Sequence, residues 1–273
     1  MKKIFALIII SSMLVLGGCS SGDKSIIWGD DMVSCDVILT DGDMYSLPVP
    51  FAYADDKGEI IVEVKKINGE NTEQADITVV TDDAEIISNT EYKGYRLGLI
   101  GLQVWLKGTE PVCINSIDME INGEETSLVF DEALKYTPGS NSMAIPLTSP
   151  LIMDGSRNGE DLLFTLQIDD KLSIVDYSTK GNYAVENSVC SVNYSYIDGI
   201  ACDVDKNDEI RYEIDFSRKD EHIYFSVNNL IINYVSDNGE KGQAVFTFNT
   251  TLMNEEEFNM VLKKIVDGDV EQK

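Results

Sequence analysis

Histidine is almost absent from this chain, because His222 is the only one in 273 residues. Zinc sites built from several histidines are therefore excluded. A Ser-His-Asp unit needs an oriented base beside a nucleophile, and no nucleophile elbow or other local signature accompanies His222. Charged residues flank His222. We expect it to lie in a hairpin loop without a functional role.

Glycine-rich phosphate loops are also missing. Gly94, Gly98 and Gly101 lack the Walker spacing and fall in or near a predicted strand. Paired carboxylates hydrolyse glycosides in many enzymes, but 48 acidic residues bring some carboxylates together in any fold. Their abundance is therefore uninformative. The sequence predicts a protein that is not an enzyme.

Basic side chains are scarce, with 21 lysines and arginines against 48 aspartates and glutamates. Losing Lys2 and Lys3 with the leader described below leaves 19 against 48, a formal side-chain charge of −29. A surface of that sign repels nucleic acid and anionic lipid headgroups, so neither is an expected partner. Cations, basic partners and neutral ligands remain compatible with it.

Cysteine is sparse as well: besides Cys19, the chain has only Cys35, Cys113, Cys190 and Cys202. A two-residue turn at Asp198-Gly199 would set Ser195 opposite Cys202 and point Cys190 to the other face of the sheet. Unless a bulge shifts that register, Cys190 and Cys202 form no disulfide. We expect buried free thiols.

The first residues have the features of an export signal. Lys2 and Lys3 precede an apolar stretch at residues 4–16, shorter than the ~20 residues that a membrane-spanning helix needs. The residues Leu16-Gly17-Gly18-Cys19 resemble the lipobox of bacterial lipoproteins. The resemblance implies that residues 1–18 are removed and that Cys19 is lipidated. The acyl chains would anchor the protein to the extracytoplasmic side of the bacterial cell membrane.

Turn dipeptides recur along the rest of the chain, with Asn-Gly beginning at 68, 122, 158 and 238 and Asp-Gly at 41, 154 and 198. These pairs supply the positive φ angles of tight hairpin turns. Short alternating or β-branched runs lie between them. Residues 97–106 are nearly all apolar, which predicts a strand buried on both sides with Trp105 in the core. The pattern indicates antiparallel β structure.

Two segments resemble each other, residues 112–130 and residues 225–246, and each combines a strand, an Asn-Gly turn and a second strand. Their offset of 113 residues, with Ile114 aligned on Val227, fits two tandem sandwiches of ~100 residues, the size of immunoglobulin-like modules. The proline-containing segment 138–154 is the expected boundary.

The end of the chain predicts a short amphipathic helix at residues 254–267. Asn254 can cap it, acidic residues fill its first turn, and apolar residues recur at helical spacing at Phe258, Val261, Leu262 and Ile265. We expect this stripe to pack on the second sandwich; docking into a partner is the alternative.

The predicted fold class is therefore mainly β, with two tandem antiparallel, immunoglobulin-like β-sandwiches and a C-terminal helix. The expected parts are a leader at 1–18, a lipidated tether at 19–31, sandwiches at 32–148 and 149–253, and the helix at 254–267.

Calcium is the one cofactor that the sequence suggests. Oxygen-bearing side chains crowd one acidic stretch, at Asp203, Asp205, Asn207 and Asp208. The stretch resembles the start of a D-x-D-x-N calcium loop, but Asp208 replaces its glycine and Ile214 its bidentate glutamate. Residues 154–159 keep the glycine and lack the glutamate. An acidic hairpin turn without metal is the simpler interpretation of both segments.

Tyr194 and Tyr196 share one face of a predicted strand, where an aromatic platform could bind sugar; core packing is the alternative. The sequence thus predicts a non-enzymatic, lipid-anchored envelope protein whose partner is an envelope protein or a glycan. The alternatives are a carbohydrate-binding module assisted by calcium, a carboxylate-dependent envelope hydrolase, and a structural domain of a larger assembly.

Overall fold

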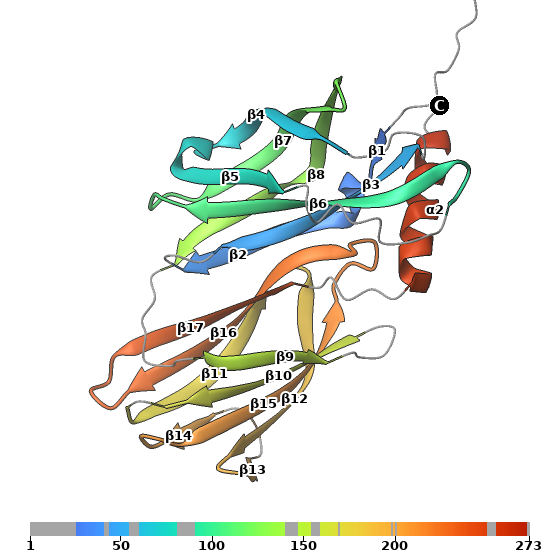
Figure 1. Cartoon of the computed structure of the whole chain (residues 1–273). Coiled ribbons are helices and arrows are strands. Elements are labelled where there is room, and N and C mark those ends of the chain that lie inside the picture. The colour runs from blue at the N-terminus through green and yellow to red at the C-terminus, as the bar shows by residue number, and fades with distance from the viewer. Residues whose placement is uncertain are drawn as a thin grey trace, which may run out of the picture.

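The computed structural model shows two β-sandwiches and one helix (Figure 1). It describes residues 26–40, 44–54, 60–80, 91–139, 147–153, 159–168, 170–197, 199, 201–249 and 255–271. Among these residues, no helix has the length and apolar character that crossing a bilayer requires.

Two four-stranded layers face each other in the first sandwich. One layer has the strand order β1 (Ile26–Trp28), β3 (Tyr45–Ala54), β6 (Tyr95–Leu106) and β5 (Ala75–Val80). The opposing layer has the order β2 (Val33–Thr40), β8 (Glu124–Gly139), β7 (Val112–Ile121) and β4 (Val62–Glu70). Two short 3-10 helices accompany them, η1 (Asp30–Met32) and η3 (Thr72–Gln74).

The second sandwich also consists of two facing sheets. Its five-stranded sheet has the order β13 (Ser195–Ile197), β12 (Tyr183–Val192), β15 (Glu209–Arg218), β10 (Gly159–Gln167) and β9 (Leu147–Met153). The facing strands are β14 (Cys202–Val204), β11 (Leu172–Lys180), β16 (Phe225–Ser236) and β17 (Lys241–Asn249). The predicted fold class, mainly β with tandem sandwiches and a C-terminal helix, is confirmed.

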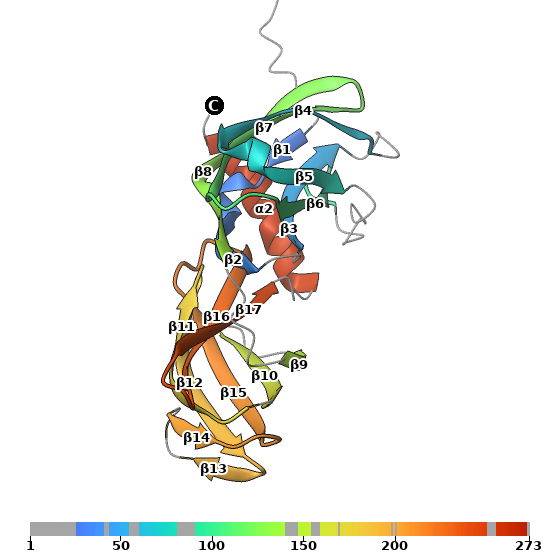
Figure 2. The same cartoon turned by 90° about the vertical axis from the view of Figure 1, so that its left-hand side faces the viewer.

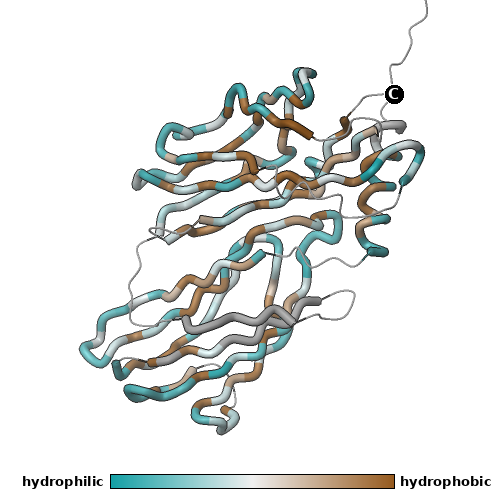
Figure 3. The backbone as a smooth tube through the Cα atoms, viewed as in Figure 1, coloured by the Kyte–Doolittle hydropathy of each residue, from teal (hydrophilic) through white to brown (hydrophobic). Residues whose placement is uncertain are grey.

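Alternation of buried and exposed residues explains why these segments form strands. In β15 every second residue from Ile210 to Phe216 is buried, and in β2 the same holds from Val33 to Leu39. One face of each strand therefore contributes to a core. Figure 3 shows apolar positions recurring along the strands, while the tips of the hairpins are mostly hydrophilic.

The turn predictions succeed at one dipeptide and fail at another. Asn122 and Gly123 have φ angles of 50° and 84° and join β7 to β8 in a two-residue turn. Asn68 and Gly69 lie instead inside β4, at a bulge. A Cβ on Gly69 would lie 1.9 Å from the carbonyl oxygen of Cys113, so close strand approach requires glycine there.

The two sandwiches share strands. The beginning of β2 pairs in parallel with β16 through Val33–Cys35, and its remainder pairs in parallel with β8. One sheet of eight strands therefore runs through both halves. The start of β16 belongs to the first core as well, because Phe225 and Val227 are buried there.

The helix α2 (Glu255–Glu271) forms where the sequence predicts a helix, but the expectation that it packs on the second sandwich is wrong. Val261, Leu262, Ile265 and Val266 are at most 4% exposed and join the first core. In both views α2 lies along the first sandwich (Figures 1 and 2).

The reason is that the central strands of the first sandwich are apolar on both faces. Residues 49–53 of β3 and 97–102 of β6 are buried without alternation, so the outer face of this layer needs a cover. The helix contacts both strands. Its Ile265 lies so close to Gly29 that a Cβ there would be 2.9 Å from the isoleucine side chain.

The predicted burial of Trp105 is wrong, because this side chain is 37% exposed. The strand β6 is buried on both faces as far as Leu102, and exposure begins beyond it. Trp28, by contrast, belongs to the fold: it lies on β1, packs at 5.4 Å from Phe51 and donates a hydrogen bond to Thr126. The first described strand thus begins at Ile26, within the range 19–31 that the sequence analysis assigns to the tether.

Candidate functional site

The most exposed aromatic side chains among the described residues lie together on the second sandwich. Tyr194 and Tyr196 are 82% and 79% exposed. With their neighbours they line a small hollow of about 80 Å³ on the outer face of the five-stranded sheet, formed by Val189, Ser191, Tyr194, Tyr196, Arg211 and Glu213. We call these six residues the tyrosine patch.

A tight turn places the first tyrosine. β12 and β13 are joined by Asn193 and Tyr194, whose φ angles are 49° and 65°, and Val192 pairs with Ser195. Two positive φ angles make this a primed turn, which glycine enters without strain and a bulky aromatic residue does not. Tyr194 therefore holds an exposed ring at some cost in backbone energy.

The acidic stretch supports this turn. The side chain of Asn193 donates to Asp208 Oδ1 at 2.7 Å and accepts from the backbone N–H of Glu209 at 3.0 Å. Asp208 also accepts from the backbone N–H of Asp205 at 2.8 Å. The hydrogen bonds from the Asp205 backbone and then from Asn193 lower the pKa of Asp208.

These contacts bear on the calcium hypothesis. Ser173 donates to Asp203, and Lys171 lies 3.5 Å from Asp205, so each carboxylate has a different protein partner. Asn207 adopts a φ of 70° within the turn. In the described part of the chain, no three acidic, cysteine or histidine side chains gather so as to hold a metal. Most of the second acidic loop, 154–159, lies outside the described residues, as does Cys19.

Charged side chains complete the tyrosine patch. Ser191 pairs with both Tyr196 and Arg211 in neighbouring strands, so these residues share the outer face. Arg211 Nη2 lies 3.3 Å from Glu213 Oε1, and both side chains are about half exposed. A shallow surface of this kind offers ring faces and a guanidinium to a partner, without a cavity that could enclose a small molecule.

The patch lies at one end of the molecule. Figure 2 shows β13 and β14 at the bottom, while β1, α2 and the C-terminal end lie in the upper half. Figure 1, viewed at 90° to Figure 2, shows the same order from top to bottom. The two views agree that β13, which carries Tyr196, and β1, the first described strand, occupy opposite ends.

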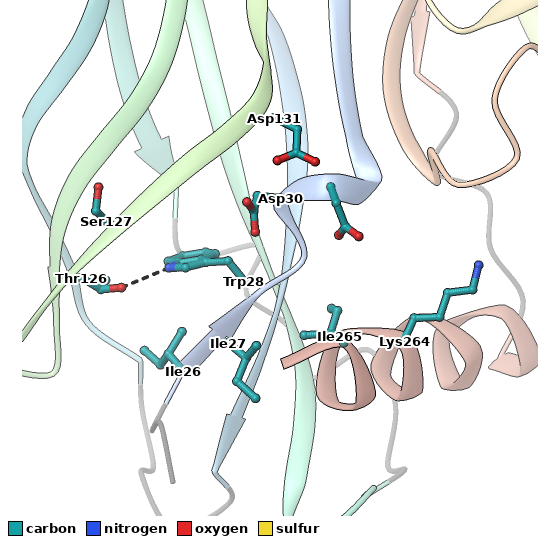
Figure 4. Close-up of a pocket in the computed structure, with 11 residues that line it drawn as sticks. Ile26, Ile27, Trp28, Asp30, Thr126, Ser127, Asp131, Lys264 and Ile265 are labelled. Atoms are coloured by element: carbon teal, nitrogen blue, oxygen red, sulfur yellow. Dashed lines mark hydrogen bonds between the residues drawn. The ribbon is translucent and has the colours of Figure 1, made fainter. Parts of the chain in front are cut away.

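A second hollow lies at the opposite end, between β1, η1, β8 and α2 (Figure 4). Its volume is about 510 Å³. Three carboxylates and one ammonium group face it beside apolar side chains; we call it the acidic pocket, with Trp28, Asp30, Asp31, Asp131 and Lys264 among its lining residues.

The charges of the acidic pocket do not balance. Burial raises the pKa of Asp31, and the nearby Asp131 carboxylate raises it further, while Lys264 acts in the opposite direction. Lys264 Nζ donates to the hydroxyl of Tyr224 at 2.7 Å. Three carboxylates against one ammonium leave the pocket negative.

The prediction that Tyr194 and Tyr196 share a strand face is wrong for Tyr194, which lies in the turn before β13, and no pattern in the sequence indicated the acidic pocket. Asp31 and Lys264 are separated by most of the chain, and only the unexpected docking of α2 on the first sandwich brings them to one hollow. The structure does not bring the tyrosine patch and the acidic pocket together.

No protein-family model and no curated protein matches the sequence. Among solved structures, the collagen adhesin of S. aureus matches at 10% identity and a TM-score of 0.27, covering 78% of this chain and 88% of that one. The major pilin subunit BcpA of Bacillus cereus matches at 9% and 0.30, covering 70% and 68%. The collagen-binding domain of RspB from Erysipelothrix rhusiopathiae matches at 7% and 0.28, covering 79% and 90%. Similarity this low carries no information about a ligand.

Proposed function

We propose that this protein is an exported, lipid-anchored binding protein of the bacterial cell envelope that uses the tyrosine patch to bind another protein. It would catalyse no reaction. The observation that supports this most is the exposure of Tyr194 and Tyr196 at the end of the molecule opposite β1.

The anchor sets the orientation. Ile26, where β1 begins, follows Cys19 by seven residues, and seven residues of extended chain span at most about 25 Å. A lipid on Cys19 would therefore keep the first sandwich beside the membrane. The tyrosine patch, at the other end, would point away from the membrane toward a partner.

The chemistry of the patch favours a protein partner. Tyrosine and arginine are the residues that most often dominate the binding energy of protein interfaces. β13 is at the edge of its sheet, where its backbone can pair with an added strand. Because the mature chain is strongly acidic, a partner with a basic contact surface is expected.

The test compares the Tyr194→Ala/Tyr196→Ala double variant with Trp105→Ala, which removes a partly exposed aromatic from the other sandwich. Binding of the immobilised proteins to fractionated envelope proteins and to a glycan array would be measured. Loss of two hot-spot tyrosines should weaken protein binding at least about 30-fold, and Trp105→Ala should leave it unchanged. Equal binding by the double variant and the unaltered protein would refute the proposal. Binding to glycans alone would support the carbohydrate-binding alternative instead.

The anchor is tested separately with Cys19→Ser. This variant should incorporate no labelled fatty acid and should appear in the soluble fraction or remain unprocessed. Ser20→Ala is the matched control and should be lipidated normally. Unchanged lipid incorporation in Cys19→Ser would remove the anchor from the proposal.

The acidic pocket supports a second candidate function, hydrolysis through paired carboxylates. Asp31, with a raised pKa, and Asp131 face one hollow, and carboxylates in unlike environments divide acid and base roles in glycosidases. Release of reducing ends from purified peptidoglycan would be measured for the unaltered protein, Asp31→Asn and Asp131→Asn. Hydrolysis that each substitution abolishes would support this candidate, and no release by the unaltered protein would eliminate it.

A further inference from the structure

Two cysteines meet in the core of the second sandwich. Cys190 lies on β12 and is 1% exposed, and Cys202 lies on β14 in the facing sheet and is half-buried. Both are free thiols in this structure and pack against the same core, where each shifts the pKa of the other, that of Cys190 downward and that of Cys202 upward. The expectation that they lie on different faces is therefore wrong.

The error comes from the position of the turn. The two-residue hairpin turn is Asn193-Tyr194, so Cys190 pairs with Ile197 in β13. The chain then leaves this sheet and enters β14, where Cys202 pairs with Ile174 of β11. Because β13 and β14 belong to different sheets, register within one hairpin does not relate the cysteines.

We propose that Cys190 and Cys202 form a disulfide in the exported protein. The bond would join the two sheets of the second sandwich and close a loop that contains Tyr194 and Tyr196. It would thereby hold the tyrosine patch against both sheets. The inference rests on the export that is part of the proposed function, because disulfides persist outside the cytoplasm.

The other two cysteines do not compete for this bond. Cys35 lies on β2 and faces the first core, where burial raises the pKa of its thiol to about 12. Cys113 lies on β7 between the buried Val112 and Ile114, so it points to the opposite face of the same layer. A disulfide between Cys35 and Cys113 is therefore excluded by their faces.

The oxidant is a thiol–disulfide oxidoreductase in its disulfide form. The half-buried Cys202 thiolate attacks one sulfur of that disulfide, which forms a mixed disulfide and releases one oxidoreductase thiol. The Cys190 thiolate then attacks Cys202 Sγ and displaces the second oxidoreductase sulfur as a thiolate. The two cysteines lose two electrons and two protons, and the oxidoreductase disulfide is reduced to a dithiol.

Mass spectrometry tests the bond on the full chain exported from a bacterium. Thiols are trapped with an alkylating reagent in denaturant before digestion with trypsin, which releases both cysteines in one peptide, residues 181–206. We expect this peptide to carry no label and to gain two labels only after reduction. Peptides containing Cys35 and Cys113 should be labelled without reduction.

Cysteine-to-serine variants provide the controls for this labelling experiment. Cys202→Ser should leave Cys190 labelled without reduction, whereas the matched Cys113→Ser should leave the unlabelled 181–206 peptide unchanged. Reduction should lower the Tm of the unaltered protein by about 5 °C and should not change that of Cys190→Ser/Cys202→Ser.

The same sample separates this inference from the anchor. Two labels on residues 181–206 without reduction, in protein whose Cys19 is lipidated, would overturn the disulfide and leave the anchor standing. An unlabelled 181–206 peptide in protein without lipid on Cys19 would support the disulfide and remove the anchor.

Discussion

The first sandwich encloses a mostly aliphatic core between two four-stranded layers and adds α2 outside one of them, whereas the second encloses a smaller core rich in rings. In the second, Phe248 stacks on Phe216 with ring centroids 5.1 Å apart and meets Tyr183 edge-on at 6.3 Å. Tyr194 and Tyr196 lie exposed on the outer face of the five-stranded sheet of the second sandwich. The two sandwiches thus differ in how their cores are filled and in what covers their outer faces.

The comparison also shows how the halves depend on each other. The two sandwiches follow each other along the chain, but the C-terminal helix returns to pack on the first. The first core is therefore complete only when the helix α2 is packed against it. The second has its own separate core.

The largest predicted effect is a loss of stability that a substitution in the helix α2 causes in the first sandwich. Leu262→Ala should lower the free energy of unfolding of the first sandwich by about 3 kcal/mol, because Leu262 is fully buried in its core. Urea unfolding followed by tryptophan fluorescence reports this half, since both tryptophans, Trp28 and Trp105, lie there. The exposed neighbour variant Lys263→Ala is the control, and an equal loss from it would contradict the packing.

A smaller effect should come from the contact between the two sandwiches, where Asn229 of β16 bonds to β2. Asn229 is fully buried, accepts from the backbone N–H of Ile38 at 2.6 Å, and donates to the Ile38 carbonyl at 3.1 Å and to Thr247 at 2.9 Å. Asn229→Ala leaves these groups unpaired and should cost about 2 kcal/mol. Tryptophan fluorescence and far-ultraviolet circular dichroism should then give separate urea midpoints. The half-buried Asn233, on the same strand, supplies the control Asn233→Ala; coincident midpoints in Asn229→Ala would show that Asn229 does not couple the halves.

A substitution in the turn that carries Tyr194 should raise stability, whereas the two preceding substitutions lower it. Tyr194→Gly removes a bulky side chain from a φ of 65° and should raise the stability of the second sandwich by about 0.5 to 1 kcal/mol. Partner binding should fall at the same time. Calorimetry would measure the gain, with Tyr196→Ala, on β13, as the control that changes stability little. A loss of stability in Tyr194→Gly would show that the ring is structural.

The smallest effect is a pH dependence confined to the first sandwich. The folded pKa of Asp31 is raised from 3.8, so ionisation of Asp31 opposes folding, and this cost is present at neutral pH and absent below about pH 4. Asp31→Asn should therefore stabilise the protein slightly at pH 7 and lose this advantage in acid.

Asp118→Asn is the matched variant of opposite sign. Hydrogen bonds from Asn68 and then Ser127 lower the pKa of Asp118, so its contribution is present above its ordinary value of 3.8 and is lost as the pH falls through its folded pKa. Urea midpoints between pH 3 and pH 7 would show both trends. The same trend in both variants would contradict these assignments.

Several features could be predicted because they depend on neighbouring residues. The alternation from Ile210 to Phe216 specifies a strand with one buried face, and Asn122-Gly123 has the φ angles that its hairpin requires. The helical spacing of Val261, Leu262 and Ile265 specifies an apolar stripe. Each of these patterns is local, and the structure confirms the element that each one predicts.

Other features depend on distant residues. Asn68-Gly69 has the composition of a turn, but pairing with β7 makes it a bulge. Trp105 continues an apolar run, but the double-sided burial of β6 ends before it. The acidic pocket unites residues from both ends of the chain, so no local pattern contains it.

The sequence alone determined the strand-rich character of this protein, its terminal helix and the residue types available for binding, because periodicity and turn chemistry act over a few residues. Only the tertiary structure decided which sandwich the helix covers, which thiols meet and where the carboxylates converge. Those outcomes depend on which apolar faces remain uncovered after the sheets form, and burial of such faces is a property of the whole fold.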